Sequence, residues 1–217
     1  MTYKKAKISE IKELPGFRRI VLSYSAEEMP LGGYVKVITD TEGPIARTIS
    51  ISQSSKESFS LDFATHESHG PVATWQRKAT VGDELVFKGP GPQSALGYNA
   101  QKFLFFGDLT AFPAIRSHLV KIQESSVKEI AIYVGEFLEE AKAYFSGDVK
   151  FLTSLDEALE LLREGDNALW AAGERTLVKS VRDFVKNENL SPKSCYMSSY
   201  WQQGHRDEEH KKSKIKG

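Results

Sequence analysis

The spacing of apolar residues changes near the middle of the chain. Up to about residue 99, apolar and polar residues alternate in short runs that glycine and proline separate. This period of two is typical of half-buried β-strands, and the turn residues between the runs favour antiparallel connections. Strands are expected at residues 3–11, 18–24, 34–39, 47–52, 58–64 and 84–88, with a short helix at 71–79. Strands of this kind can close into a small barrel without exposed edges.

From residue 102 onward, apolar segments suited to buried strands alternate with amphipathic helical segments. This order predicts a parallel sheet with right-handed crossovers. Strands are expected at residues 102–106, 128–134, 149–152, 167–172 and 195–200, and helices at 113–122, from 154 and at 174–187. Ser154 and Glu157 fit a capping box at the start of the second of these helices.

The two patterns of apolar residues predict two domains in this chain of 217 residues. We expect residues 1–99 to form a six-stranded antiparallel β-barrel and residues 100–204 to form an α/β domain with a five-stranded parallel sheet. The glycine- and proline-rich segment 88–97 suits the junction. Residues 205–217 contain almost nothing apolar, so we expect a basic, flexible tail.

Charge and cysteine content narrow the function classes. The chain carries 29 basic and 29 acidic residues, which argues against wholesale binding to nucleic acid or anionic membranes. Its single cysteine, Cys195, excludes an internal disulfide and a cysteine-ligated cluster within one chain. No segment approaches the roughly 18 apolar residues of a membrane helix. We expect a cytoplasmic monomer that does not insert into membranes.

The fourth predicted strand carries candidate binding chemistry. Arg47 and Ile49 should face one way, and Thr48 and Ser50 the other. A guanidinium suits a phosphate, and a hydroxyl can hydrogen-bond a flat heterocycle, which together predict a flavin dinucleotide lying along the strand. The alternative is an ordinary barrel strand with a solvated arginine.

Two further segments follow predicted parallel strands at their carboxyl ends, where doubly wound sheets bind ligands. No Gly-x-Gly-x-x-Gly is present, which argues against a dinucleotide fingerprint of that type. Asp108 and Thr110 could also act simply as a helix cap. The residues of these segments are Asp108, Thr110, Ala111, Ala172, Gly173 and Glu174.

Five segments, taken in order, resemble one known family. Residues 47–50 are similar to the Arg-x-Tyr-Thr/Ser signature of the ferredoxin-reductase superfamily, and residues 66–75 to a His-Gly-x-x-Gly-Pro-Ala-Ser-x-Trp loop. Residues 107–115 resemble Asp-Glu-Thr-Ala-Leu-Pro-Ala-Ile, and residues 170–174 and 200–204 recur in the same order. This pattern resembles the siderophore-interacting proteins, which are FAD-dependent ferric-siderophore reductases.

The resemblance implies that NADPH or NADH gives a hydride to FAD, which passes single electrons to a ferric siderophore. It places Ser50 near flavin N5, Thr110 near the nicotinamide, and Tyr200 and Trp201 over both rings. It implies no catalytic side chain, because the cofactors carry the chemistry. The remaining implied cofactor contacts are Ala64, His66, Gly70, Pro71, Val72, Ala73 and Thr74.

Two departures from the family pattern qualify this prediction. Ile49 stands where the family has an aromatic residue that packs on the flavin, so we expect weaker flavin retention or a changed potential. Glu67 replaces a glycine, which puts the local loop geometry in doubt. An anionic siderophore would need basic residues, for which the candidates are Lys36, Arg77, Lys78, Lys211, Lys212, Lys214 and Lys216.

The sequence leaves other functions open. The protein could be a general flavin reductase or one coupled to ferredoxin, or a module that only binds a ferric chelate. Glu139 and Glu140 would disfavour the 2′-phosphate of NADPH if they border the ribose, whereas Arg175 and Lys179 would favour it.

Overall fold

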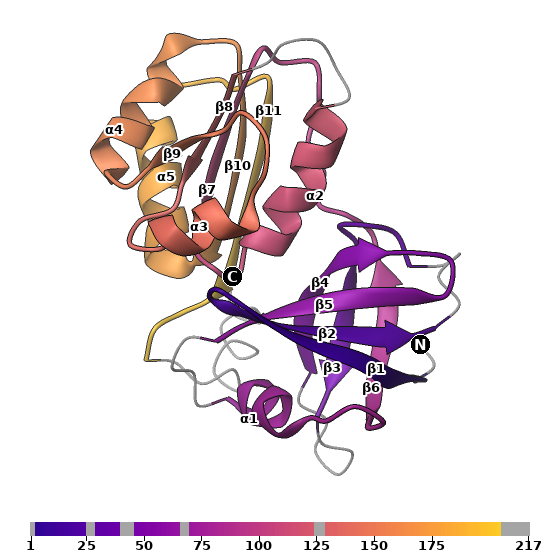
Figure 1. Cartoon of the computed structure of the whole chain (residues 1–217). Helices are drawn as coiled ribbons and strands as arrows, with labels where there is room; N and C mark the ends of the chain where they lie inside the picture. Colours follow the sequence, from indigo (N-terminus) through magenta and orange to yellow (C-terminus); the bar gives the residue numbers. More distant parts are fainter. Residues whose placement is uncertain (1–2, 25–28, 40–45, 66–69, 124–128, 205–217) are drawn as a thin grey trace.

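The chain folds into two domains that lie side by side (Figure 1). The structure is a computed structural model, and it describes residues 3–24, 29–39, 46–65, 70–123 and 129–204. The amino-terminal domain is built from antiparallel strands, and the carboxy-terminal domain is an α/β layer structure. None of the helices in these residues is long and apolar enough to cross a membrane.

The first domain is a closed barrel with the strand order β1-β2-β5-β4-β3-β6. All of its neighbouring strands pair antiparallel, which confirms the predicted six-stranded barrel. Phe59 and Phe87 fill its interior with their rings 5.6 Å apart. Its elements are β1 (Lys4–Leu14), β2 (Phe17–Ser23), β3 (Tyr34–Ile38), β4 (Ala46–Ser54), β5 (Ser58–Ala64), α1 (Pro71–Lys78) and β6 (Glu84–Gly91).

The second domain contains a five-stranded sheet with the order β11-β10-β7-β8-β9. Every neighbouring pair is parallel, as predicted. The strands are β7 (Lys102–Gly107), β8 (Glu129–Tyr133), β9 (Lys150–Leu152), β10 (Asn167–Glu174) and β11 (Ser194–Trp201). The helices are α2 (Phe112–Gln123), α3 (Leu138–Tyr144), α4 (Leu155–Glu160), η2 (Leu161–Glu164) and α5 (Arg175–Asn187).

Helices cover both faces of this sheet (Figure 1). Residues of α2 and α3 pack with Phe103, Phe105 and Trp170 in one apolar cluster. Residues of α4, η2 and α5 pack with Leu104 and Phe106 in the other cluster. Alternate residues of β7 thus face opposite layers, and this explains why the strand is apolar on both sides.

The sequence predictions missed α3. The amino-terminal cap of this seven-residue helix is Phe137, whose side chain makes no capping hydrogen bond, so the usual start signal is absent. The predicted cap at Ser154 is confirmed, because its hydroxyl accepts a hydrogen bond from the amide of Glu157 at 3.3 Å.

Apolar and polar contacts join the two domains. Phe17 of the barrel is fully buried in the core of the α/β domain, with its ring 4.6 Å from that of Tyr144. Next to it, Arg19 donates two hydrogen bonds of 2.7 Å to Asp62, and the Tyr144 hydroxyl donates a third, of 2.6 Å, to the same carboxylate. The buried Asp62 therefore links β2 and β5 to α3.

The segment between β6 and β7 is held by a buried histidine. The two ring nitrogens of His118 lie 2.7 Å from the hydroxyl of Tyr98 and 3.0 Å from that of Ser94. Ser94 also accepts a hydrogen bond of 3.0 Å from the indole of Trp170. Burial, with a smaller contribution from the charge of Lys121, lowers the pKa of His118 to about 4, so the ring is neutral near pH 7.

Candidate functional site

The arginine and hydroxyl motif lies in the first half of β4. Arg47 stands opposite Val37, and Ser50 stands opposite Tyr34 on β3. Arg47 is half-buried, and burial lowers the pKa of its guanidinium. Thr48 is exposed. Ile49 packs against the barrel core, so its side chain serves packing as well as any ligand.

The start of α1 suits an anion. Gly70 is the cap residue and Pro71 follows it, yet no side chain makes a capping hydrogen bond and the first turn carries no acidic residue. A Cβ added at Gly70 would meet no atom within 4 Å, so space is open beside the first amides. Such amides attract phosphate through their N–H groups and the helix dipole.

The body and the far end of α1 are anchored to the barrel. Val72 is buried in the barrel core, and Trp75 packs its ring 5.9 Å from that of Phe63. At the other end of the helix, the guanidinium of Arg18 donates to the carbonyls of Gln76 and Ala79. The helix therefore presents its uncapped amino terminus from a fixed position.

The Arg47 end of β4 and the start of α1 belong to one end of the barrel. Ile51 pairs with Leu61 in the antiparallel β4–β5 ladder, so residues before Ile51 lie toward the end of β5. The chain then leaves β5 at Ala64 and enters α1 six residues after Thr65. A guanidinium, an uncapped helix start and a strand hydroxyl thus share this end, and this donor set fits a flavin dinucleotide with its diphosphate.

Asp108 is the centre of the second group of residues. One oxygen of its carboxylate accepts hydrogen bonds from the amide of Thr110 at 2.8 Å and from its hydroxyl at 2.5 Å. The other oxygen accepts from the amide of Glu174 at 2.7 Å and from the indole of Trp201 at 2.9 Å. Asp108 therefore caps the turn before α2 and also ties together the carboxyl ends of β7, β10 and β11.

Gly173 makes this arrangement possible. Its φ of +124° is a conformation that side chains rarely adopt, and a Cβ there would lie 2.5 Å from the Asp108 carboxylate. Glu174 then caps α5 by accepting hydrogen bonds from the amides of Thr176 and Leu177. Ala111 and Ala172 are fully buried beneath this edge.

A cavity of about 290 Å³ opens beside Asp108 at the ends of β7 and β8. Its charged lining residues are both acidic, Asp108 and Glu136. The rest of the lining is small or apolar apart from Tyr133, whose pKa is raised by burial and then by the charge of Glu136. Sequence reasoning missed Glu136 because it lies in a loop outside every recognised motif.

Contacts at the β1–β2 turn bring the two groups of residues together. The amide of Thr65, at the end of β5, donates to the carbonyl of Gly16 at 2.9 Å. A Cβ at Gly16 would lie 3.2 Å from Leu109, the residue after Asp108. The binding end of the barrel therefore faces the carboxyl edge of the sheet.

Of the other predicted site residues, some lie near the motif on β4, some lie away from it, and some fall outside the described residues. Lys36 is exposed beside Thr48 on the neighbouring strand. Arg77 and Lys78 lie in the last turn of α1, away from its uncapped start. Tyr200 is 38% exposed. His66, Glu67, Lys211, Lys212, Lys214 and Lys216 lie outside the described residues.

The four residues considered for nucleotide selection do not line the cavity. Glu139 pairs with Lys142, and Glu140 packs beside Gly16. Arg175 donates to Gln202, and Lys179 pairs with Asp183.

The barrel and the sheet edge together define a two-domain protein of the ferredoxin-reductase type. The model of the siderophore-interacting FAD-binding domain matches residues 23–94, and that of the siderophore-interacting protein matches residues 136–204. The chain belongs to the siderophore-interacting protein family.

Known proteins agree with this assignment. Ferric vibriobactin reductase ViuB of Vibrio cholerae is 27% identical over 198 residues, covering 83% of this chain and 73% of that protein. The NADPH-dependent ferric-chelate reductase of Escherichia coli is 22% identical, covering 67% of this chain and 61% of that protein.

Solved structures share the fold. The siderophore-interacting protein of Acinetobacter baumannii superimposes with a TM-score of 0.82 at 22% identity, covering 99% of this chain and 96% of that one. Phthalate dioxygenase reductase has a TM-score of 0.69 at 12% identity, covering 94% and 70% of the two chains.

Proposed function

We propose that the protein is a cytoplasmic FAD-dependent reductase that uses NADH or NADPH to reduce ferric siderophores to ferrous iron. When bound, the flavin accepts a hydride and releases its two electrons singly, enough for two ferric ions. Hard oxygen ligands hold ferrous iron less firmly than ferric iron, so reduction releases the metal. One observation carries the proposal. The end of the barrel that contains Arg47 contacts, through the β1–β2 turn, the edge of the parallel sheet that contains Asp108.

The chain's own residues bind and orient the two nucleotides. Arg47 and the first amides of α1 would hold the diphosphate of FAD, and Ser50 would offer a hydroxyl to the flavin ring. Asp108 holds Thr110 and Trp201 through hydrogen bonds to its two carboxylate oxygens, and these two residues would border the nicotinamide. Lys36, exposed next to the motif strand, and the tail lysines attract an anionic chelate.

The acidic cavity favours NADH over NADPH. We propose that it receives the adenosine ribose of the nicotinamide nucleotide, because it opens at the carboxyl ends of parallel strands. At the Glu136 end of the cavity, a 2′-phosphate would face a carboxylate, whereas a ribose diol can donate hydrogen bonds to it. The two oxygens of Asp108 already accept four hydrogen bonds from the protein.

A spectroscopic experiment tests the reductase assignment. The purified protein, reconstituted with FAD, should be yellow, should bleach anaerobically with NADH, and should recover its colour when a ferric siderophore is added. An Arg47→Met variant should bind FAD at least about tenfold more weakly, as expected for a lost charged hydrogen bond to phosphate.

Arg182→Met is the matched control, because Arg182 is an exposed arginine on the outer helix α5. A yellow protein that neither nucleotide bleaches would favour ferredoxin as the electron donor. A protein that is colourless after incubation with excess FAD and removal of the unbound flavin would leave only the chelate-binding alternative.

A further inference from the structure

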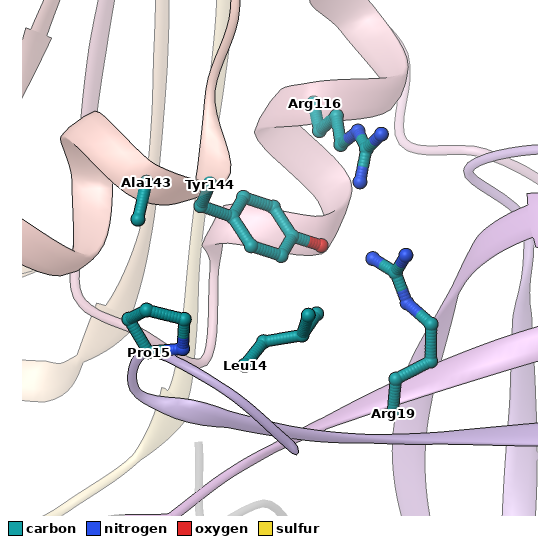
Figure 2. A pocket seen from close by; sticks show the side chains of 6 residues that line it. All are labelled: Leu14, Pro15, Arg19, Arg116, Ala143 and Tyr144. Carbon is teal, nitrogen blue, oxygen red and sulfur yellow. The ribbon is translucent and has the colours of Figure 1, made fainter. Parts of the chain in front are cut away.

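A second cavity lies between the domains, on the face formed by β2, α2 and α3 (Figure 2). It measures about 200 Å³. The barrel contributes the β1–β2 turn and Arg19, and the α/β domain contributes α2 and α3. The lining residues are Leu14, Pro15, Arg19, Arg116, Ala143 and Tyr144.

Two arginines face this cavity from opposite domains. Figure 2 shows the guanidinium groups of Arg19 and Arg116 pointing toward one another, with the hydroxyl of Tyr144 beside them. Arg19 is only 8% exposed, and two of its nitrogens bind Asp62. A ligand anion between the two groups would contact both guanidinium groups at once.

Within the described part of the chain, the charge of Arg116 is not neutralised by a carboxylate. Its guanidinium lies over the face of the Tyr144 ring, 5.3 Å from the centroid. Asp62 cancels one of the two positive charges. One positive charge therefore remains at the cavity, so the cavity suits a ligand that carries one negative charge.

The other walls of the cavity are apolar. Leu14, Pro15 and Ala143 carry no polar side-chain atoms, and the ring of Tyr144 adds an aromatic surface. Arginine forks bind carboxylates in a bidentate way, whereas apolar walls favour a hydrocarbon body. We propose that this interdomain cavity binds a small monocarboxylate with an apolar body, of about the size of benzoate, with its carboxylate between Arg19 and Arg116.

Such a ligand would contact both domains at once. It would bind the docked arrangement and not the separated domains, so it should raise the unfolding temperature in proportion to its occupancy. The site is distinct from the flavin and nucleotide positions, so its test does not depend on the reductase assignment.

Calorimetric titration of the full chain with benzoate, in the absence and in the presence of added FAD, tests the proposal. We expect one site per chain. Benzyl alcohol, a neutral molecule of similar shape, should not bind, and inorganic phosphate should bind more weakly than benzoate. Absence of benzoate binding up to about 10 mM would overturn the proposal, since weaker affinity is not that of a formed site. Phosphate binding as tightly as benzoate would overturn the carboxylate class.

Two variants locate the binding. Arg116→Met should weaken benzoate binding at least tenfold, an effect of about 1.4 kcal/mol. Ala143→Trp should abolish binding by filling the cavity, and it should fold because Ala143 is exposed. Arg182→Met, on α5, should leave binding unchanged. Benzoate binding that survives both cavity variants would place the ligand elsewhere and refute the assignment.

Discussion

The indole of Trp201 donates a hydrogen bond of 2.9 Å to the carboxylate of Asp108, 93 residues earlier in the chain. The same oxygen accepts the amide of Glu174, so one side chain fixes the ends of three parallel strands. The proposed nicotinamide position is bordered by this cluster. The geometry of the site therefore depends on a carboxylate that is an acceptor for every donor around it.

Replacing Asp108 with asparagine should loosen this cluster. An amide group in place of one oxygen would point N–H at N–H, leaving a buried donor unsatisfied at a cost of about 1–3 kcal/mol in the free energy of unfolding. Urea unfolding measures this change, and the emission of Trp201 should shift as its partner is lost. Asp148→Asn, on an exposed loop, is the control and should be neutral. Equal stability of D108N and wild type would contradict the assigned role.

Replacing Ile49 with tyrosine should tighten FAD binding. Stacking of an aromatic ring contributes on the order of 0.5–1.5 kcal/mol beyond burial, which corresponds to about two- to tenfold in the dissociation constant. Quenching of flavin fluorescence on titration measures it. Ile11→Tyr is the matched control, because Ile11 is also half-buried against the barrel core. An FAD affinity that Ile49→Tyr leaves unaltered would show that Ile49 does not border the ring.

Reversing the charge of Glu136 should change the nucleotide preference. Glu136→Lys places a cation at the cavity, so we expect the ratio of kcat/KM for NADPH to that for NADH to rise about tenfold. Steady-state oxidation of each nucleotide with a small artificial acceptor measures the ratio. Glu139→Lys, on the exposed face of α3, should leave it unchanged. If both variants shift the ratio equally, the effect is one of overall charge and the cavity assignment fails.

Stability should fall as the pH is lowered from 7 to 5. The pKa of His118 is about 4 in the folded protein and near 6.5 in an unfolded chain, so the unfolded state binds more protons across this interval. The contribution of His118 to the free energy of unfolding should decrease by about 2 kcal/mol over this range. Urea unfolding at the two pH values measures it. His118→Gln should show a correspondingly smaller pH dependence; an identical dependence would mean that other groups are responsible.

The fold could be predicted because its two periodicities differ. Alternation over residues 3–64 and buried runs such as residues 102–106 lead to the observed barrel and sheet. Helix α3 was missed because it is short and its cap residue, Phe137, offers no polar side chain, although Glu139 and Glu140 lie in its first turn and Lys142 in its last.

The site was only partly predictable. Asp108 and Glu174 could be grouped because parallel strands end at one edge, so topology alone brings them together. Glu136 and the Arg19–Arg116 pair could not be found in this way, because docking of separate segments creates their environments. A single sequence carries no periodic signal for such tertiary contacts.

The shared carboxylate of Asp62 has a consequence for engineering. If the chain were cut between β6 and β7 and its halves were produced separately, Asp62 would lose the phenol of Tyr144, and Phe17 would face water. The two domains therefore cannot be exchanged independently between proteins. A chimaera that joins this barrel to the nucleotide half of another reductase would need an aromatic pocket and a phenol at the new border before it could assemble.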